Sequence, residues 1–295
     1  MRYNYDRMEF LGCFMKNFLL DNGIEYIALI PLEKCKVLKE YLLTKNGFSL
    51  DANVLTMLIP YRTECLPTNL SVYASVKDYH GFVSTLAEKL EKYAAEKYPC
   101  AKIKLFSDHS PIDEVHAACI SGLGFIGANG LLINEKYSSF VFLAECITDL
   151  TPQELGMEYA LDTGVKECFH CGACAKACPS KCIEKREDVD GFNPKALCLS
   201  AITQKKGVLS DDEIRLMREN NTVWGCDVCQ NVCPYTKNAE FSKIQYFKED
   251  VITTLTQDAL DKMSDVEFLS RPFSWRGRGV VERNLSYFEE GENAK

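Results

Sequence analysis

The sequence predicts an α+β fold followed by a cysteine-rich module and a short helical tail. Short apolar runs alternate with helical patterns in the first part of the chain, nine of its fifteen cysteines gather in the next part, and the last part has a helical pattern. A chain of 295 residues with 46% hydrophobic content is long enough for a large core and an added module. We therefore expect domains at 1–165, 166–240 and 241–295.

The first half of the α+β domain is expected to alternate strands and helices. Strands are predicted at 26–30 and 54–59, because both runs are rich in strand-forming residues and end at a proline. The lysine-rich stretch between them can form a helix. Apolar residues then recur at helical spacing from Phe82 to Tyr98, and 103–106 has the pattern of a third strand.

The second half of this domain contains one predicted helix and two predicted strands. The helix runs from about Pro111 to Ser121, with Ser110 as its N-cap and the proline in its first turn. Apolar runs follow at 131–133 and 140–143, and the polar residues between them predict a turn. We expect these two runs to pair as a β-hairpin.

Eight cysteines form a pattern that supplies ligands for two [4Fe-4S] clusters. The first run reads C-x2-C-x2-C-x3-C-P, the second reads C-x2-C-x3-C-P, and one more cysteine lies between them. A tight loop provides three of the four thiolates that a cube needs, and in two-cluster ferredoxins the cysteine before proline binds the other cluster. The expected ligands are Cys168, Cys171, Cys174 and Cys233 for one cluster, and Cys178, Cys226, Cys229 and, as the best candidate for the fourth place, Cys198 for the second. Such clusters carry single electrons.

Zinc sites and disulfides are the alternatives for these cysteines. Zinc prefers two C-x2-C pairs, which differ from this pattern, and disulfides need an oxidising compartment, to which no signal directs the chain. The other cysteines are expected to be small buried hydrophobic residues, and only Cys182, four residues after Cys178, is near enough to be a ligand. They are Cys13, Cys35, Cys65, Cys100, Cys119, Cys146 and Cys182.

Charge and hydropathy exclude some classes of function. The net charge of −8 argues against a general affinity for nucleic acid, which draws on clustered lysine and arginine. No apolar run is long enough to span a bilayer, and 1–20 has the pattern of an amphipathic helix instead of a signal peptide. We expect a cytoplasmic protein with no membrane partner. The candidates for a local basic patch, for which a solvated face is the simpler interpretation, are Lys205, Lys206, Arg271, Arg276, Arg278 and Arg283.

The segment Gly122–Gly127 fits the pattern G-x-G-x-x-G. That fingerprint binds a dinucleotide where a strand enters the glycines and a helix leaves them. Here a predicted helix enters and a predicted strand leaves, so we do not expect a nicotinamide site. Two interpretations stay open: a backbone that approaches a flat or bulky ligand closely, and a tight turn from helix to strand.

Several of these segments together resemble the epoxyqueuosine reductases, a cobalamin-dependent family related to the reductive dehalogenases. The order and spacing of the segments match as well, and the most specific element is Gly-Cys-Asp-x-Cys-Gln-x-x-Cys-Pro. The matching segments are 73–80, 107–111, 122–129, 145–149, 168–179, 198–200 and 225–234.

The resemblance implies an α/β corrinoid-binding domain of nitroreductase-like type, followed by a two-[4Fe-4S] ferredoxin-like module, with cobalamin held between the two. It implies an oxidoreductase that reduces epoxyqueuosine in tRNA to queuosine, with electrons passing through the clusters to cobalt. The tRNA is then the substrate, and an external donor such as flavodoxin or ferredoxin supplies the electrons. We expect a monomer.

The resemblance also implies roles for individual residues. Asp108 is the expected proton donor to the epoxide oxygen, and its alternative role is a helix N-terminal cap. His80 could instead be a core histidine with satisfied hydrogen bonds. The residues expected to contact the corrin are Gly122, Gly124, Gly127 and Asn129 from the glycine loop, and Asp78, Tyr79 and His80 from the pocket wall.

The chain departs from the family pattern at three positions. Ala128 stands where the family usually has lysine, and Val115 and Cys119 stand in place of an arginine and a glutamate. The expected short form also stops before the helical repeats that help hold the anticodon arm, which puts its grip on tRNA in doubt. Two alternatives follow: a dehalogenase-like reductase of a small molecule, and an electron-transfer or corrinoid-handling protein without substrate chemistry.

Overall fold

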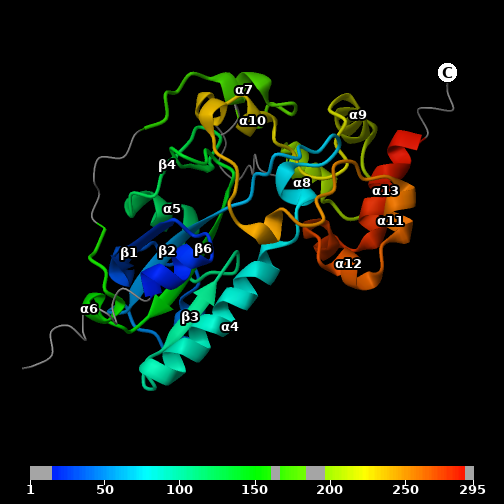
Figure 1. Cartoon of the computed structure of the whole chain (residues 1–295). Coiled ribbons are helices and arrows are strands. Elements are labelled where there is room, and N and C mark those ends of the chain that lie inside the picture. The colour runs from blue at the N-terminus through cyan, green and yellow to red at the C-terminus, as the bar shows by residue number, and fades with distance from the viewer. Residues whose placement is uncertain (1–14, 161–166, 184–196, 290–295) are drawn as a thin grey trace, which may run out of the picture. The chain divides into compact units, whose positions relative to one another are not determined.

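The computed structural model describes residues 15–160, 167–183 and 197–289. The chain forms two compact units: unit 1 contains 1–60 and 80–169, and unit 2 contains 61–79 and 170–295 (Figure 1). Of the helix expected in 1–20, residues 15–20 are helical, and residues 1–14 lie outside the described residues. The division into three domains stays a prediction. No helix among the described residues is both long and apolar enough to cross a membrane.

Unit 1 is built on a four-stranded antiparallel sheet with the strand order β1-β2-β6-β3. β2 is buried along its whole length, and β6 lies between β2 and β3, so each of these two strands pairs along both edges. The three strands predicted before residue 110 are confirmed. The strands are β1 Tyr26–Pro31, β2 Asn53–Pro60, β3 Ile103–Phe106 and β6 Val141–Thr148.

The predicted hairpin of 131–133 with 140–143 is wrong. β5, Leu132–Ile133, pairs with β4, Phe125–Ile126, whereas the later run becomes β6 and joins the large sheet. β6 is eight residues long and its second half is fully buried. A strand of this length buries more apolar surface between two long partners than beside a two-residue strand, so the tertiary contacts override the local turn.

A helix packs on each face of the sheet. α5, Glu114–Ile120, contributes Ala117 to the core cluster that contains Ile147 of β6. Neighbouring residues of a strand point to opposite faces, so Cys146 faces away from α5. On that face lies α4, Tyr79–Lys97, and the charge of its Glu91 raises the pKa of the Cys146 thiol. The remaining helices of unit 1 are η1 Leu32–Lys34, α2 Glu40–Lys45 and α6 Pro152–Leu155.

α5 begins later than predicted, and its N-cap is Asp113 instead of Ser110. The Asp113 carboxylate accepts a hydrogen bond from the His116 N–H at 3.1 Å. The reason lies in the preceding residues: the Pro111 carbonyl accepts hydrogen bonds from the N–H groups of 38–39, so this stretch is held by a neighbouring segment instead of entering the helix.

Unit 2 consists of short helices joined by loops. Its first segment contains α3, Val72–Ser75, and its cysteine-rich part contains α7, Ala173–Ala177, and α10, Val228–Asn231, which pack against each other. The helical pattern predicted for the last part of the chain is confirmed. The other helices are α8 Leu199–Thr203, α9 Asp211–Glu219, η3 Pro234–Asn238, η4 Gln245–Phe247, α11 Gln257–Lys262, α12 Asp265–Leu269, η5 Pro272–Arg276 and α13 Arg278–Glu289.

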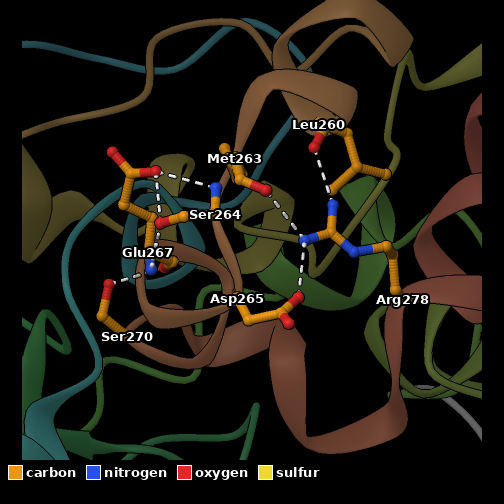
Figure 2. Close-up of polar contacts among 7 residues, drawn as sticks. All are labelled: Leu260, Met263, Ser264, Asp265, Glu267, Ser270 and Arg278. Carbon is orange, nitrogen blue, oxygen red and sulfur yellow. Dashed lines mark hydrogen bonds and ion pairs between the residues drawn. The ribbon is translucent and has the colours of Figure 1, made fainter.

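Arg278 ties the C-terminal helices together. Its guanidinium donates to the carbonyls of Leu260 at 2.7 Å and Met263 at 3.0 Å, and it lies 3.8 Å from a carboxylate oxygen of Asp265 (Figure 2). The two carbonyls belong to the end of α11 and the residue that follows it. A cation at the C-terminal end of a helix satisfies carbonyls that have no partner within the helix.

Further along α13, two side chains donate hydrogen bonds to carbonyls of α8 and of nearby loops. The Asn284 amide is fully buried and donates to the carbonyls of Thr203 at 2.7 Å and Val223 at 2.8 Å. Arg283 donates to the Lys205 carbonyl at 2.7 Å. These side chains therefore hold unit 2 together, as Arg278 does. For Arg278 and Arg283 the sequence had suggested a basic patch or a solvated face instead.

Gly225 is expected to tolerate no side chain. Its φ of 77° is left-handed, and a Cβ atom there would overlap the Ser71 side chain. We expect Gly225→Ala to lower the free energy of unfolding by about 2–4 kcal/mol in urea denaturation. Gly207→Ala is the matched control, because its φ is 82° but its Cβ would meet nothing within 4 Å. Equal losses at the two positions would contradict the steric explanation.

Candidate functional site

From Cys171 onward, the two cysteine runs lie side by side in unit 2. α7 contains Cys174 and ends at Cys178, and α10 contains Cys229 and is followed by Cys233. Because α7 packs against α10, the cysteine before proline of each run is close to the other run. Crossed ligation of two clusters requires this arrangement.

The thiols predicted for the second cluster are neighbours. Burial is the main cause that raises the pKa of Cys226 to about 12, and the nearby Cys198 and Cys229 contribute to the rise. Cys198 also acts on Cys182, whose Sγ lies 3.6 Å from the Sγ of Cys178. Cys198 is thus near both halves of the predicted set, and Cys182 is a fifth thiol beside it.

Two properties of these thiols suit them to bind iron–sulfur clusters: sulfur is a soft ligand, and the two runs lie close together. No three His, Cys, Asp or Glu side chains in the described parts of the chain converge on a site for one metal ion. A cube takes its four thiolates at four different iron atoms, so its ligands need not meet at one point. Seven soft sulfur ligands in two neighbouring runs, with Cys198 between the runs in the sequence, fit iron–sulfur clusters.

Asp227, between two predicted ligands, shapes the second cysteine loop. Its carboxylate is buried and accepts hydrogen bonds from the Val72 N–H at 2.6 Å and the Gln230 amide at 2.7 Å. Burial raises the pKa of Asp227 to about 6. The sequence motif contains this aspartate. Its role in joining the segment 61–79 to the cysteine loop could not be predicted, because its partner Val72 lies far away in the sequence.

Asp108 lies in an exposed loop with an unusual backbone conformation. Its φ is 56°, a left-handed value that aspartate adopts more easily than most residues, and its side chain is 72% exposed. The Nε2 atom of His80 lies 3.4 Å from a carboxylate oxygen of Asp108. The next residue, His109, contacts the Lys39 amine at 3.3 Å and the Tyr41 hydroxyl at 3.1 Å, which holds the loop in place.

This geometry decides two alternatives left open by the sequence. Asp108 is not the cap of the following helix, because Asp113 caps α5. His80 is not a core histidine, because half of its side chain is exposed beside Asp108. The other residues of the predicted pocket wall belong to unit 2: the Asp78 N–H donates to the Ser270 carbonyl at 2.8 Å.

Two carboxyl groups beside this loop were not predicted. Glu145 of β6 is completely buried, and neither of its oxygens has a donor in hydrogen-bonding geometry. Burial raises its pKa well above the ordinary value, and the neighbouring Glu114 raises it further. Burial and the charge of Asp108 also raise the pKa of Glu114 to about 7, although Lys39 acts in the opposite direction. An acidic residue in an otherwise apolar strand was the available signal.

The glycine loop forms the hairpin of β4 and β5 after α5, so a helix does enter it and a strand does leave it. A Cβ atom on Gly124 would lie 2.5 Å from the Ile133 carbonyl oxygen, and one on Gly127 would lie 2.7 Å from the Asn129 side chain. Close packing within the hairpin thus explains these glycines. Ile126 is 45% exposed, which leaves apolar surface available to a ligand.

The cysteines outside the clusters divide into two groups. Cys35, Cys146 and Cys182 are buried, as expected for small hydrophobic residues. Cys65 and Cys100 are exposed, so the prediction that they are buried is wrong. Cys65 lies in a bend and Cys100 in a turn, outside the strands and helices. Cys119 is intermediate, and Cys13 lies outside the described residues.

Comparison with known proteins identifies relatives over most of the chain. A family model described as a 4Fe-4S double cluster binding domain matches residues 167–236. The chain is 32% identical to the epoxyqueuosine reductase of Lactococcus garvieae, with 77% of this chain and 63% of that protein covered. It is 30% identical to that of Listeria monocytogenes, with 70% and 53% covered. The chain thus spans less than two thirds of the length of these two relatives.

Solved structures share the fold. An epoxyqueuosine reductase with a tRNA-Tyr epoxyqueuosine-modified stem loop matches with a TM-score of 0.73 and 22% identity, covering 95% of this chain and 81% of that chain. The Bacillus subtilis epoxyqueuosine reductase, with its catalytic aspartate loop swung out of the active site, matches with a TM-score of 0.70 and 21% identity over the same shares. The predicted mixed helix and sheet fold is confirmed.

The two buried carboxyls predict how stability depends on pH. Their pKa values are raised above the ordinary 4.5, so the native state binds more protons than the unfolded state above that pH. The contribution of each to the free energy of unfolding is complete below pH 4.5. That of Glu114 is lost as the pH rises through about 7, and that of Glu145 is lost as the pH rises through its own raised pKa. We expect Glu145→Gln to weaken this dependence in thermal unfolding between pH 5 and pH 8. Glu88→Gln, on exposed α4 surface, is the control and should match the wild type.

The prediction that Cys198 is the fourth ligand of the second cluster can be tested by comparing it with the neighbouring thiol of Cys182. We propose Cys198 for this place, and we expect Cys198→Ala to lose up to half of the iron or to convert one cluster to a three-iron form visible by electron paramagnetic resonance. Cys182→Ala, which removes the fifth thiol, should keep the iron content and the spectrum of the wild type. The reverse result would assign the ligand to Cys182.

Proposed function

This chain belongs to the epoxyqueuosine reductase family, and we propose that it reduces the epoxide of epoxyqueuosine in tRNA to the alkene of queuosine. The observation that carries this proposal is the Asp108 loop: an exposed carboxylate with a left-handed backbone beside His80, in a chain that also carries an iron–sulfur module. The Bacillus subtilis relative has a catalytic aspartate loop, and another relative was solved with the modified tRNA stem loop.

The reaction sets the tasks of the residues. An epoxide becomes an alkene when two C–O bonds break, two electrons and two protons are taken up, and one water molecule leaves. When bound, cobalamin supplies the redox-active metal for breaking the C–O bond, and [4Fe-4S] clusters supply electrons one at a time. The residues of the protein bind and orient these groups and move the protons.

Asp108 is the proposed proton donor to the epoxide oxygen. Its carboxyl is accessible, and its loop is anchored through His109, so the acid is presented from a defined position. His80, at 3.4 Å, orients the carboxyl and stabilises the carboxylate that remains after the proton has been given. We propose that tRNA is the substrate and that flavodoxin or ferredoxin reduces the clusters of a cytoplasmic, monomeric protein.

The cofactors are assigned to the predicted residues. Two [4Fe-4S] clusters would take the seven cysteines of the two runs and Cys198, and the packing of α7 on α10 supports the crossed sets. Cobalamin would be held by the glycine loop and by the residues around His80. Exposed Ile126 and Leu131 on the hairpin of β4 and β5 support this assignment, because a corrin presents a broad apolar surface.

Two features favour a small-molecule substrate as the second candidate. Ala128 occupies the place where the family usually has lysine, and the chain has a net charge of −8. Both features remove positive charge that would attract the phosphates of tRNA. A reductase of the dehalogenase type would keep the same cofactors and the same proton donor.

The test is the reduction of an epoxyqueuosine-modified anticodon stem loop by the reconstituted protein under strong reductant, and complementation of a queuosine-deficient strain. We expect Asp108→Asn to lower the rate by about 100-fold or more, because the amide cannot supply the proton. Asp113→Asn is the control, since asparagine also caps a helix. An active Asp108→Asn protein would contradict the assignment of the donor, and an inactive wild type that binds cobalamin would favour the small-molecule reaction.

A further inference from the structure

The proposed reduction needs more protons than Asp108 can hold. Each turnover takes up two electrons and two protons, and a single carboxyl holds one proton. The external donor supplies the electrons through the iron–sulfur module. After Asp108 has given its proton to the oxygen, its carboxylate must be protonated again before the oxygen leaves as water or the next turnover begins. A second acid close to Asp108 would perform this task.

Glu145 is an acid in an unusual position. It lies in the middle of β6, opposite Thr56 of β2 and Phe106 of β3, on the face of the sheet that α5 covers. The side chain is completely buried, and neither oxygen has a partner in strict hydrogen-bonding geometry, although the Ser110 hydroxyl and the Glu114 carboxyl lie close enough to act on it. A buried carboxylate without a donor or a cation is very unfavourable, so this group is stable only when it carries a proton.

Glu114 connects this buried acid with the exposed loop. It stands at the start of α5, beside Glu145, and its Oε1 accepts a hydrogen bond from the backbone N–H of Asp108 at 3.1 Å. Glu114 thus lies beside both the Glu145 carboxyl and the Asp108 backbone, and we call Glu145, Glu114 and Asp108, taken from the core of unit 1 to its surface, the acid row. The buried end of the row is Glu145, and the exposed end is Asp108 beside His80.

The surroundings keep at least one proton in this row. The charges that act most strongly on Glu145 are those of Glu114 and Asp108, and both are acidic. Polar groups near it include Ser110 from the loop before α5, Cys35 from the segment after η1 and Thr56, which is its partner on β2. One positive charge, that of Lys39, acts on Glu114 and lowers its pKa. Two carboxyls in contact without a cation share a proton, because the doubly ionised pair is strongly unfavourable.

We infer, on the basis of the proposed function, that Glu114 and Glu145 form a proton store that protonates Asp108 again within each turnover. Glu145 holds the proton in the core, and Glu114 passes it to the loop. Neither residue contacts the substrate, so both act through Asp108. A purely structural role for Glu145 predicts instead that the neutral, isosteric glutamine serves equally well at every pH.

The store itself can be observed without any activity. Infrared spectroscopy of the full chain with its clusters detects the C=O stretch of protonated carboxylic acids. We expect the wild type to keep such a band at pH 7, well above the pH at which exposed carboxyls ionise, and Glu145→Gln to lose it. Glu88→Gln, at an exposed position of α4, should keep the band. An unchanged band in Glu145→Gln would overturn the store.

The role in turnover is tested by the pH dependence of the rate with the modified anticodon stem loop. We expect Glu145→Gln to lower kcat by about tenfold at pH 8 with an unchanged KM, and Glu145→Asp to restore part of the loss, since aspartate carries a proton and glutamine carries none that it can give. Thermal unfolding shows whether the variants fold. Identical pH profiles for Glu145→Gln and Glu88→Gln would overturn the role in turnover. An inactive wild type would refute the proposed function, whereas the infrared result would still decide whether the store exists.

Discussion

The pairing of β6 with β2 and β3 is the constraint on which unit 1 depends. Eight residues of β6 pair with β2, and four of them also pair with β3, so the register of this strand determines which side chains face α5. The register that buries Ile147 and packs the partly buried Leu143 on this face buries Glu145 with them. A shift by one residue would turn all three to the opposite face. The buried acid is therefore a consequence of a register that the apolar residues enforce.

Unit 2 depends on a different kind of contact. Gly225 allows the chain to pass against Ser71, and the carboxylate of Asp227 then receives the Val72 N–H. Gly225 and Asp227 are the sequence neighbours of Cys226. The contacts that join 61–79 to the cysteine loop therefore also hold the backbone of this predicted cluster ligand in place. Short helices bury little apolar surface each, which is why buried polar side chains such as Asn284 do much of the joining.

The two units supply the two things that the proposed reduction consumes. Electrons require soft ligands for iron, and the cysteine runs of unit 2 provide them. Protons require acids that stay protonated near neutral pH, and burial beside like charges produces such acids in unit 1. The exposed Asp108 meets the substrate in this proposal, while the acids behind it are protected from solvent. In this arrangement one residue is accessible to the substrate, and other residues hold the protons.

The sequence by itself determined the features that depend on residues close together in the chain. The spacing of the cysteines predicted iron–sulfur clusters, and apolar periodicity located the main strands and α4, because ligand loops, strands and helices have short repeats. Tertiary structure alone decided which strand pairs with which, where α5 begins, and that Glu145 and Glu114 stand behind Asp108. The hairpin expected at 131–143 failed for the same reason. Partners that lie far apart in the sequence are selected by the burial of apolar surface and by the satisfaction of backbone hydrogen bonds, and no local pattern records that selection.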